Sequence, residues 1–479
     1  MRVLVTGATG YIGGRLAPML AGRGHQVRCL TRSRRRLDGV PWAAGVEVAE
    51  GDMLRPETLP AALAGVEVVY YLVHSLGGQD FETTDRRAAT NLAAAARTAG
   101  VRRLVYLGGP APAAEPEPGR TREPAPGRTR EPEPGGTRES AHLRSREEVA
   151  QILLGSGVPT VVLRAAVILG SGSTSFELLR YLTERLPVMV APRWLHNRVQ
   201  PIAIGDVLHY LYGVMDLPAE VHRDFDIGGP EVLTFGDLMR RYARVAGLPR
   251  RLIVPVPLLT PWLSSLWMGL VTPLPVQLAR PLVESLVHEA VSRDRDIDRH
   301  VPLPPDGLTG VDDAIAQALA RLRSGQAEPD WSVTGPADPL PTDPGWAGGT
   351  VRVDRRTVNA QASPEQVWRA VRRVAGQADR YLRPSASLLG PVERLDDRSV
   401  RMRVQPRGPG LAWLEMRVAA RNGDARYEQR MWFVPRGLAG ELYWYAAALP
   451  RVYGLARMAR AIRRTAERAP LTPTAGRAV

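Results

Sequence analysis

The stretch Thr6-Gly7-Ala8-Thr9-Gly10-Tyr11-Ile12-Gly13 decides the fold of the first half of the chain. It follows the short apolar run Val3-Leu4-Val5 and leads into a helical pattern from Tyr11 to Arg23. Glycine lets the chain turn tightly and brings backbone N–H groups close to a pyrophosphate at the helix N-terminus, where the helix dipole favours anions. Glycines spaced G-x-x-G-x-x-G between a strand and a helix therefore predict a dinucleotide site.

Strand and helix patterns alternate beyond this turn. Further strands are expected at 26–30, 46–48, 68–72, 104–107, 160–164 and 225–230, and helices at 57–63, 85–99, 144–154, 176–182 and 206–214. Alternation of this kind predicts the α/β class with a doubly wound parallel Rossmann sheet. We expect residues 1–323 to form this domain, with a small substrate subdomain that includes a lid at 230–300.

The end of the second strand predicts which cofactor is bound. An acidic residue there would accept hydrogen bonds from the ribose of NAD(H), but the chain has Thr31-Arg32-Ser33-Arg34-Arg35-Arg36. Arg32 can pair with a 2′-phosphate through bonds worth roughly 1.5–3 kcal/mol each, which favours NADP(H) over NAD(H). Solvated positions are favoured for Arg35 and Arg36. The full set of expected cofactor residues is Gly7, Thr9, Gly10, Tyr11, Ile12, Gly13, Arg32, Asp52, Met53, Leu72 and His74.

Composition narrows the class of protein. The 479 residues exceed one ordinary core, and the 63 Lys and Arg against 49 Asp and Glu give a net charge of +14. No aromatic residues interleave with a basic stripe, so nucleic acid is not an expected partner. The single cysteine, Cys29, excludes an internal disulfide and a cysteine-built zinc site, and no metal is expected. No secretory signal precedes the first strand, which favours a cytoplasmic location.

Several segments lack the pattern of a packed core. An octad containing proline and glycine repeats three times over residues 115–138, which predicts a disordered insertion at 113–140. Residues 252–279 carry no charged residue and five prolines; a lid or substrate pocket is favoured, and a peripheral membrane contact is the alternative. Residues 324–349 have the composition of a linker, and 471–479 of a disordered tail.

Residues 350–470 change to an α+β pattern. A strand is expected at 351–360, and Ser363-Pro364-Glu365-Gln366 has the residues of a capping box with proline at the first helical position. Strands at 400–404, 412–418 and 427–434 and a closing helix at 452–468 complete a separate domain.

The first 320 residues resemble the short-chain dehydrogenase/reductase superfamily in its extended and atypical branch, which includes NmrA-like and quinone-oxidoreductase-subunit-like proteins. The residues that carry the resemblance are the glycine turn, Gly51-Asp52, Asn91 and the run from Gln200 to Asp206. The resemblance implies a catalytic Tyr-x-x-x-Lys pair after the fifth strand. This chain instead places His142 and Arg146 in those positions, and Gly108-Gly109 has no hydroxyl.

Three functional hypotheses remain open at this point, of which the third is a membrane-surface protein that uses residues 252–279 and the arginine-rich closing helix. His142 could act as a general acid near neutral pH, with Arg146 holding the ribose, in an NADP(H)-dependent reductase of a small apolar carbonyl or quinone-like substrate. Alternatively, His142 is structural and the protein is a non-catalytic dinucleotide-binding sensor or assembly protein.

The C-terminal domain resembles START-type helix-grip domains, on the basis of its first strand, capped helix and closing helix. The resemblance implies an apolar ligand cavity. Five aromatic residues could line it or form core: Trp413, Trp432, Tyr443, Trp444 and Tyr445. The closing helix carries Arg457, Arg460, Arg463, Arg464 and Arg468, for which a solvated face is favoured over a lipid-headgroup site.

Overall fold

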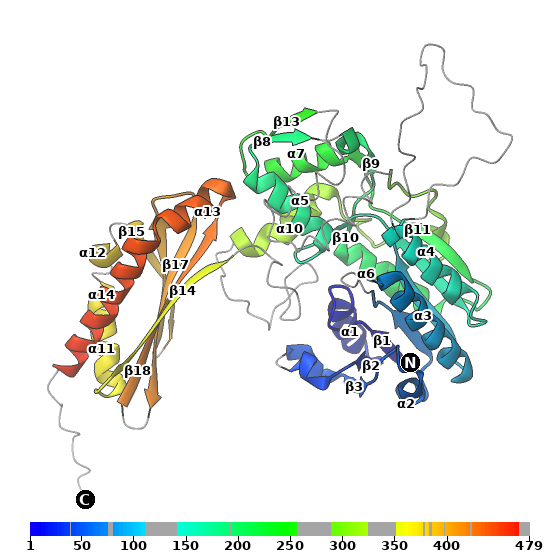
Figure 1. Ribbon diagram of the computed structural model, residues 1–479, viewed down its shortest axis with the longest axis horizontal. Coiled ribbons are helices and arrows are strands. Elements are labelled where there is room, and N and C mark those ends of the chain that lie inside the picture. The colour runs from blue at the N-terminus through cyan, green and yellow to red at the C-terminus, as the bar shows by residue number, and fades with distance from the viewer. Residues whose placement is uncertain are drawn as a thin grey trace, which may run out of the picture. The chain divides into compact units, whose positions relative to one another are not determined.

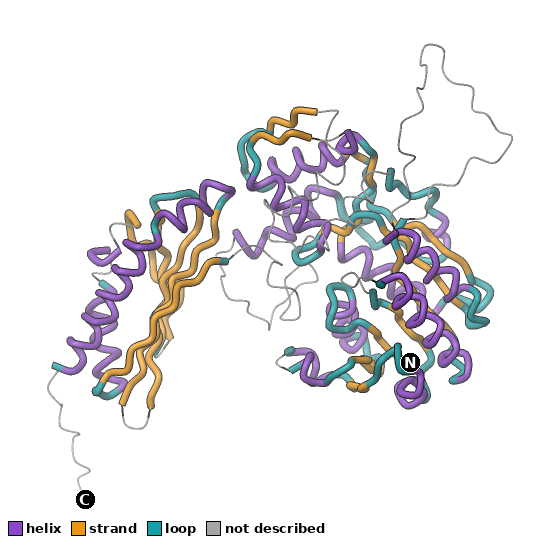
Figure 2. Tube along the Cα trace, viewed as in Figure 1, coloured by secondary structure: helices purple, strands orange, loops and turns teal. Residues whose placement is uncertain are grey.

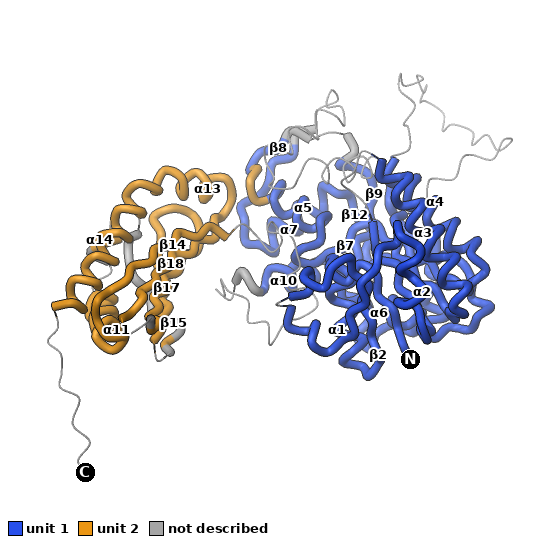
Figure 3. The backbone as a smooth tube through the Cα atoms, turned by 60° about the horizontal axis from the view of Figure 1, so that its bottom comes forward, with its two compact units in different colours: residues 1–183, 187–321, 329–348 blue, residues 184–186, 322–328, 349–479 orange. Residues whose placement is uncertain are grey.

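The computed structural model describes residues 1–38, 40–74, 80–110, 141–191, 193–255, 289–323, 351–376, 379–382, 386–396, 398–421 and 424–468. The chain divides into two compact units (Figure 3), the first consisting mainly of residues 1–183 and 187–321 and the second mainly of 349–479. The expected octad insertion, the linker, the terminal tail and most of the apolar stretch 252–279 lie outside the described residues.

Unit 1 is built on a seven-stranded parallel sheet (Figure 1) with the order β11-β6-β5-β4-β1-β2-β3. The strands are β1 (Arg2–Thr6), β2 (Gln26–Thr31), β3 (Glu47–Glu50), β4 (Val68–Tyr71), β5 (Arg103–Gly108), β6 (Thr160–Ala165) and β11 (Arg223–Ile227). The order reverses direction between β1 and β4, which is where doubly wound sheets bind their ligands. The α/β fold class is confirmed.

Helices cover both faces of this sheet (Figure 2). Helices α1 (Gly13–Gly22) and α6 (Ile204–Gly213) share a core with alternate strand residues such as Val3 and Val5, whereas Leu4 between them packs into the core on the other face. That second core contains residues of α2 (Leu59–Leu63), α3 (Phe81–Thr98) and α4 (Ala141–Leu154). Because successive side chains of a strand point to opposite faces, the continuous apolar strands expected from the sequence bury both sides.

The remaining described elements of unit 1 are short paired strands and three helices. The pairs are β7 (Ile168–Leu169) with β10 (Ile202–Ala203), β9 (Arg198–Val199) with β12 (Leu233–Thr234), and β8 (Val188–Ala191) with β13 (Leu252–Pro255). The helices are α5 (Thr174–Arg185), α7 (Phe235–Val245) and α10 (Val311–Arg323). Of the expected lid at 230–300, residues 256–288 lie outside the described part.

Unit 2 is a five-stranded antiparallel sheet with the order β14-β18-β17-β16-β15. Its strands are β14 (Arg352–Ala360), β15 (Ala386–Asp396), β16 (Ser399–Pro406), β17 (Gly410–Arg421) and β18 (Asp424–Pro435). Its helices are α11 (Pro364–Ala375), α12 (Asp379–Leu382), α13 (Gly437–Ala446) and α14 (Ala448–Glu467). Residues of α11 and α14 share one core with the sheet. The sequence analysis missed β15, α12 and α13.

The capping box at the start of α11 is confirmed. The Ser363 hydroxyl accepts a hydrogen bond from the Gln366 backbone N–H at 3.3 Å, and the Gln366 side chain accepts from the Ser363 backbone N–H at 2.8 Å. Two N–H groups that the helix geometry leaves unpaired are thereby satisfied.

The aromatic residues of unit 2 separate into core and surface. Trp413 and Trp444 are buried, and Trp444 stacks on Phe433 with ring centroids 5.3 Å apart. Tyr445 is 62% exposed, so the expectation that it lines a cavity or the core is wrong. The START-type resemblance stays a prediction.

Removal of the Ser363 hydroxyl tests whether the capping box stabilises α11. We expect Ser363→Ala to lower the free energy of unfolding of unit 2 by about 1 kcal/mol, because the Gln366 N–H then loses its acceptor. Chemical denaturation would measure the loss. Ser363→Thr keeps a capping hydroxyl and is the control; equal destabilisation by the two variants would contradict the assignment.

Candidate cofactor and active site

The glycine turn after β1 has a shape that side chains would block. Gly7 has φ of +71°, and a Cβ atom there would lie 2.5 Å from the carbonyl oxygen of Leu72. A Cβ at Gly13 would lie 2.3 Å from the Gly7 carbonyl oxygen. The Gly10 N–H closes the turn by donating to the Gly7 carbonyl at 2.9 Å. The turn therefore presents open backbone at the start of α1, as pyrophosphate binding requires.

Thr6 fixes this turn against the neighbouring strand. Its hydroxyl donates to the Tyr70 carbonyl at 3.0 Å and accepts from the Leu72 N–H at 3.1 Å. The ends of β1 and β4 are thus joined by a buried side chain at the point where the strand order reverses. The open edge beyond them is the position expected for a dinucleotide.

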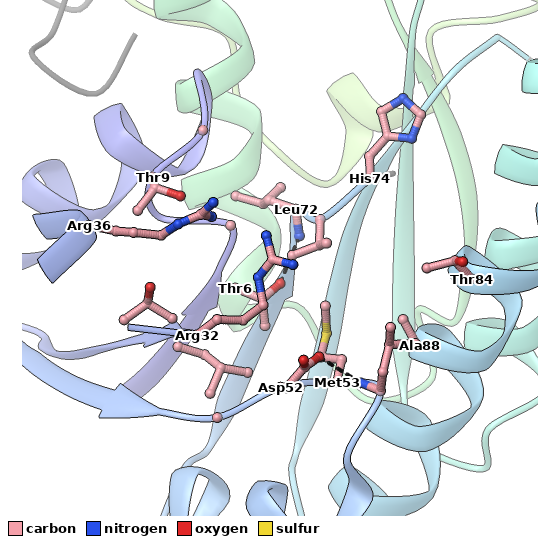
Figure 4. A pocket seen from close by; sticks show the side chains of 17 residues that line it. Thr6, Thr9, Arg32, Arg36, Asp52, Met53, Leu72, His74, Thr84 and Ala88 are labelled. Carbon is pink, nitrogen blue, oxygen red and sulfur yellow. Dashed lines mark hydrogen bonds between the residues drawn. The ribbon is translucent and has the colours of Figure 1, made fainter. Parts of the chain in front are cut away.

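A cavity of about 570 Å³ lies on the β2 side of the turn. It is lined by Thr6, Gly7, Thr9, Gly10, Leu30, Thr31, Arg32, Arg36, Gly51, Asp52, Met53, Leu54, Leu72, Val73, His74, Thr84 and Ala88. Figure 4 shows the Arg32 and Arg36 side chains reaching into this cavity near Thr9, with His74 at its far end. Arg36 is exposed, as expected, but its side chain also lines the cavity. Sequence spacing missed it because Arg36 reaches the cavity from a 3₁₀ turn at 34–37.

Asp52 and Met53 are held in a constrained loop after β3. The Asp52 carboxylate accepts from the Leu54 N–H at 3.0 Å, and the Asp52 N–H donates to Thr58 Oγ1 at 3.0 Å. The Asn91 side chain in α3 donates to the Met53 carbonyl at 2.8 Å. Asn91, noted in the sequence only as part of the resemblance, thus positions the floor of the cavity.

A second cavity of about 270 Å³ continues from the first. The two share Gly7, Gly10, Leu72, Val73 and His74. The second is also lined by Tyr11, Ile12, Gly13, Tyr106, Leu107, Gly108, Gly109, Pro110, His142, Leu143, Arg146, Ala165, Ala166, Val167, Ile168, Ser173, Thr174, Ser175, Leu178, Phe235 and Ala290. Every residue predicted for cofactor or catalysis therefore lines one or both cavities. A basic end at Arg32 and Arg36 leads past the glycine turn to a largely apolar end at His142.

Two histidine rings meet at the junction of the cavities. The rings of His74 and His142 lie 4.8 Å apart between centroids. His74 Nδ1 is 3.4 Å from the Asp85 carboxylate, which also accepts from the Ser145 hydroxyl at 3.4 Å. Asp85 and Ser145 are both buried, and the sequence analysis missed them because they come from α3 and α4, 60 residues apart.

Both rings are neutral at physiological pH. Burial, followed by the Arg146 charge, lowers the pKa of His74 to about 4 despite the opposing effect of Asp85. Burial, Arg146 and His74 together lower the pKa of His142 to about 2. The expectation that His142 acts as a general acid near neutral pH is therefore not supported, because the imidazolium form is too unstable there. A neutral ring can still donate one N–H hydrogen bond.

Polar atoms at this junction have capacity for a ligand. Within the part of the chain that the structure describes, His74 Nε2, His142 Nδ1 and Arg146 Nε are buried without a hydrogen-bond partner. Buried polar atoms in native proteins are normally paired, so these three atoms have hydrogen-bonding capacity that no described residue uses. The same described residues contain no cluster of three metal-ligating side chains.

Comparison with known proteins agrees with this geometry. A protein family described as NAD(P)H-binding matches residues 7–180. The fold of triphenylmethane reductase from Citrobacter sp. superposes with a TM-score of 0.50 at 20% identity, covering 67% of this chain and all of that one. Residues 7–180 thus match an NAD(P)H-binding family, and unit 1 shares the fold of that reductase.

Sequence relatives match over shorter stretches. A farnesyl-dihydroquinoline-oxide ketoreductase from Stigmatella aurantiaca is 29% identical over 180 residues, which are 37% of this chain and 53% of that protein. The photosystem II assembly factor Ycf39 from Synechocystis sp. is 31% identical over 109 residues, 22% of this chain and 33% of that protein. The chain thus spans about half or less of the length of these relatives.

The lowered histidine pKa values predict a pH dependence of stability. Between pH 6.5 and about 4 the unfolded chain binds protons on His74 and His142 that the folded chain does not. The free energy of unfolding should therefore fall as pH falls through this window. Denaturation of unit 1 at several pH values should show a smaller fall in His142→Gln than in wild type. A fall unchanged from wild type in His142→Gln, or equally reduced in His209→Gln outside the cavities, would contradict the burial argument.

Proposed function

We propose that this protein is an NADP(H)-dependent reductase of a small apolar carbonyl or quinone-like compound. The observation that carries the proposal is the pair of joined cavities, basic at the adenosine end and apolar with neutral imidazoles at the other. The similarity of residues 7–180 to NAD(P)H-binding proteins, and of 180 residues to a ketoreductase, supports it.

The preference for NADP(H) rests on charge. A 2′-phosphate carries negative charge that Arg32 and Arg36 can meet from two sides of the cavity wall. Arg34 serves another purpose, because its side chain donates to the Val48 carbonyl at 2.8 Å and its N–H to Glu50 at 2.8 Å. No carboxylate ends β2, whose last residue is Thr31.

The apolar cavity would bind the substrate with its oxygen beside α4. NADP(H), when bound, supplies the hydride. His142 donates an N–H hydrogen bond to the substrate oxygen while remaining neutral, the Arg146 guanidinium stabilises the negative charge that develops there, and a water molecule supplies the proton that converts the alkoxide to the alcohol. Asp85 holds the His74 ring through Nδ1, which leaves His74 Nε2 as an acceptor on the cavity wall. In this scheme, neutral His142 takes the place of the tyrosine as hydrogen-bond donor. The permanently charged Arg146 takes the place of the lysine.

The cofactor assignment is tested by calorimetric titration with NADPH and NADH. We expect Arg32→Ala and Arg36→Ala each to weaken NADPH binding by roughly tenfold or more and to leave NADH binding nearly unchanged, since one charge-assisted bond to the 2′-phosphate is lost. Arg35→Ala is the matched control, because Arg35 is exposed and does not line the cavity. An equal loss of affinity for NADPH and for NADH would contradict the contact of these two arginines with the 2′-phosphate.

The catalytic assignment is tested by turnover. Oxidation of NADPH in the presence of quinones and apolar ketones should be lost in His142→Phe and reduced by about tenfold to a thousandfold in Arg146→Gln, with cofactor affinity largely kept in His142→Phe. His209→Gln should behave as wild type.

A non-catalytic sensor or assembly protein is the second candidate. The missing Tyr-x-x-x-Lys pair and the partial similarity to an assembly factor favour it. Tight NADPH binding without turnover of any carbonyl or quinone by the wild-type chain would select it over the reductase.

A further inference from the structure

Five exposed large apolar side chains of unit 2 gather on two consecutive helices. Of the twelve large apolar residues that the described part of the chain exposes, five lie within residues 438–453. They are Leu438 (47% exposed), Leu442 (62%), Tyr445 (62%), Leu449 (85%) and Tyr453 (61%). Water-facing leucines at this density are uncommon on a soluble surface and indicate an interaction site.

Helical spacing places these residues on outward faces. Leu438, Leu442 and Tyr445 follow the i, i+4, i+7 rule on α13, whose buried side is formed by Gly440, Glu441 and Trp444. Leu449 and Tyr453 are four residues apart on α14, and only Ala447 separates the two helices. The inner side of α14 packs on the sheet through other residues: Leu455, Met458, Ala459 and Ile462. Figure 1 shows α13 leading directly into α14 along unit 2.

The same outward face of α14 becomes cationic towards its C-terminus. Arg457, Arg460 and Arg464 continue the spacing of Leu449 and Tyr453, and all three are exposed. Arg457 also lies over the Tyr453 ring, 5.8 Å from its centroid. Further exposed cations of the segment are Arg436, Arg463 and Arg468.

Negative charge in this segment is neutralised by protein contacts. Glu441 is buried and pairs with Arg352 at 3.0 Å. Glu467 is 3.9 Å from Arg463. The exposed charge between residues 436 and 468 is therefore strongly positive, in a chain whose net charge is already +14.

We propose that α13 and the first half of α14 bind the surface of an anionic lipid bilayer. Leucines would enter the acyl boundary, the two tyrosines would lie at headgroup depth, and the α14 arginines would pair with lipid phosphates. Among the described residues, no helix is long and apolar enough to cross a membrane. The proposed contact lies at the bilayer surface. The proposal is independent of the reductase function. It replaces the solvated face expected for the arginines.

The positive charge of this surface favours an anionic lipid bilayer over a second copy of the chain as its partner. A second copy of this basic face would oppose six exposed arginines with six more, which disfavours self-association. An anionic membrane supplies both an apolar layer for the leucines and phosphates for the arginines.

Cosedimentation of the full-length chain with vesicles tests the proposal. Wild type should pellet with vesicles containing about one third phosphatidylglycerol, should not pellet with pure phosphatidylcholine, and should release on raising salt from about 0.05 to 0.5 M. The double variants Leu442→Glu/Leu449→Glu and Arg457→Glu/Arg460→Glu should each lower the partition coefficient by at least about tenfold.

The controls separate this surface from general basicity. Leu303→Glu and Arg299→Glu alter exposed residues of unit 1 and should pellet as wild type. Thermal unfolding and light scattering on every variant exclude loss of folding and a change of oligomer size. No pelleting of wild type with anionic vesicles, equal pelleting of all variants, or an oligomer that disappears in Leu442→Glu/Leu449→Glu would overturn the proposal.

Discussion

The contact between Gly7 and the carbonyl of Leu72 is the constraint on which the rest of the site depends. With 2.5 Å between that oxygen and the position of a Cβ, only glycine fits, and only glycine adopts its φ of +71° without strain. The end of β4 can therefore approach the end of β1 closely, and the Thr6 side chain joins the two. The wall that the two cavities share results from this close packing of the ends of β1 and β4.

The two ends of the site differ in the charged groups that their surroundings allow. At the β2 end, arginines face solvent-connected space, where permanent charge can attract a phosphate at little desolvation cost. At the α4 end, burial disfavours the charged form of the imidazoles, and among the described residues the cation beside them is the Arg146 guanidinium, which does not deprotonate. A hydride acceptor placed there would meet hydrogen-bond donors and fixed positive charge in a largely apolar pocket.

Local signals in the sequence predicted much of the architecture. The glycine spacing, the apolar alternation and the Ser363–Gln366 box each act within a few residues, and the structure contains all three. Strand β15 was missed because its pairing with β16 is interrupted by register shifts, which break the period-two pattern. Helix α13 was missed because its exposed side carries apolar residues whereas its buried side includes Glu441, so no amphipathic period marks it.

By itself, the sequence determined the Rossmann class, the glycine turn and the basic end of the cavity at Arg32, since these depend on backbone freedom and on charge near one strand. Only the tertiary structure decided that Arg36 reaches the cavity, that Asp85 and Ser145 meet His74, and that His142 is neutral. These properties arise where segments distant in sequence pack together and exclude water. Burial of that kind is a property of the assembled core, because it depends on which side chains the fold brings into contact.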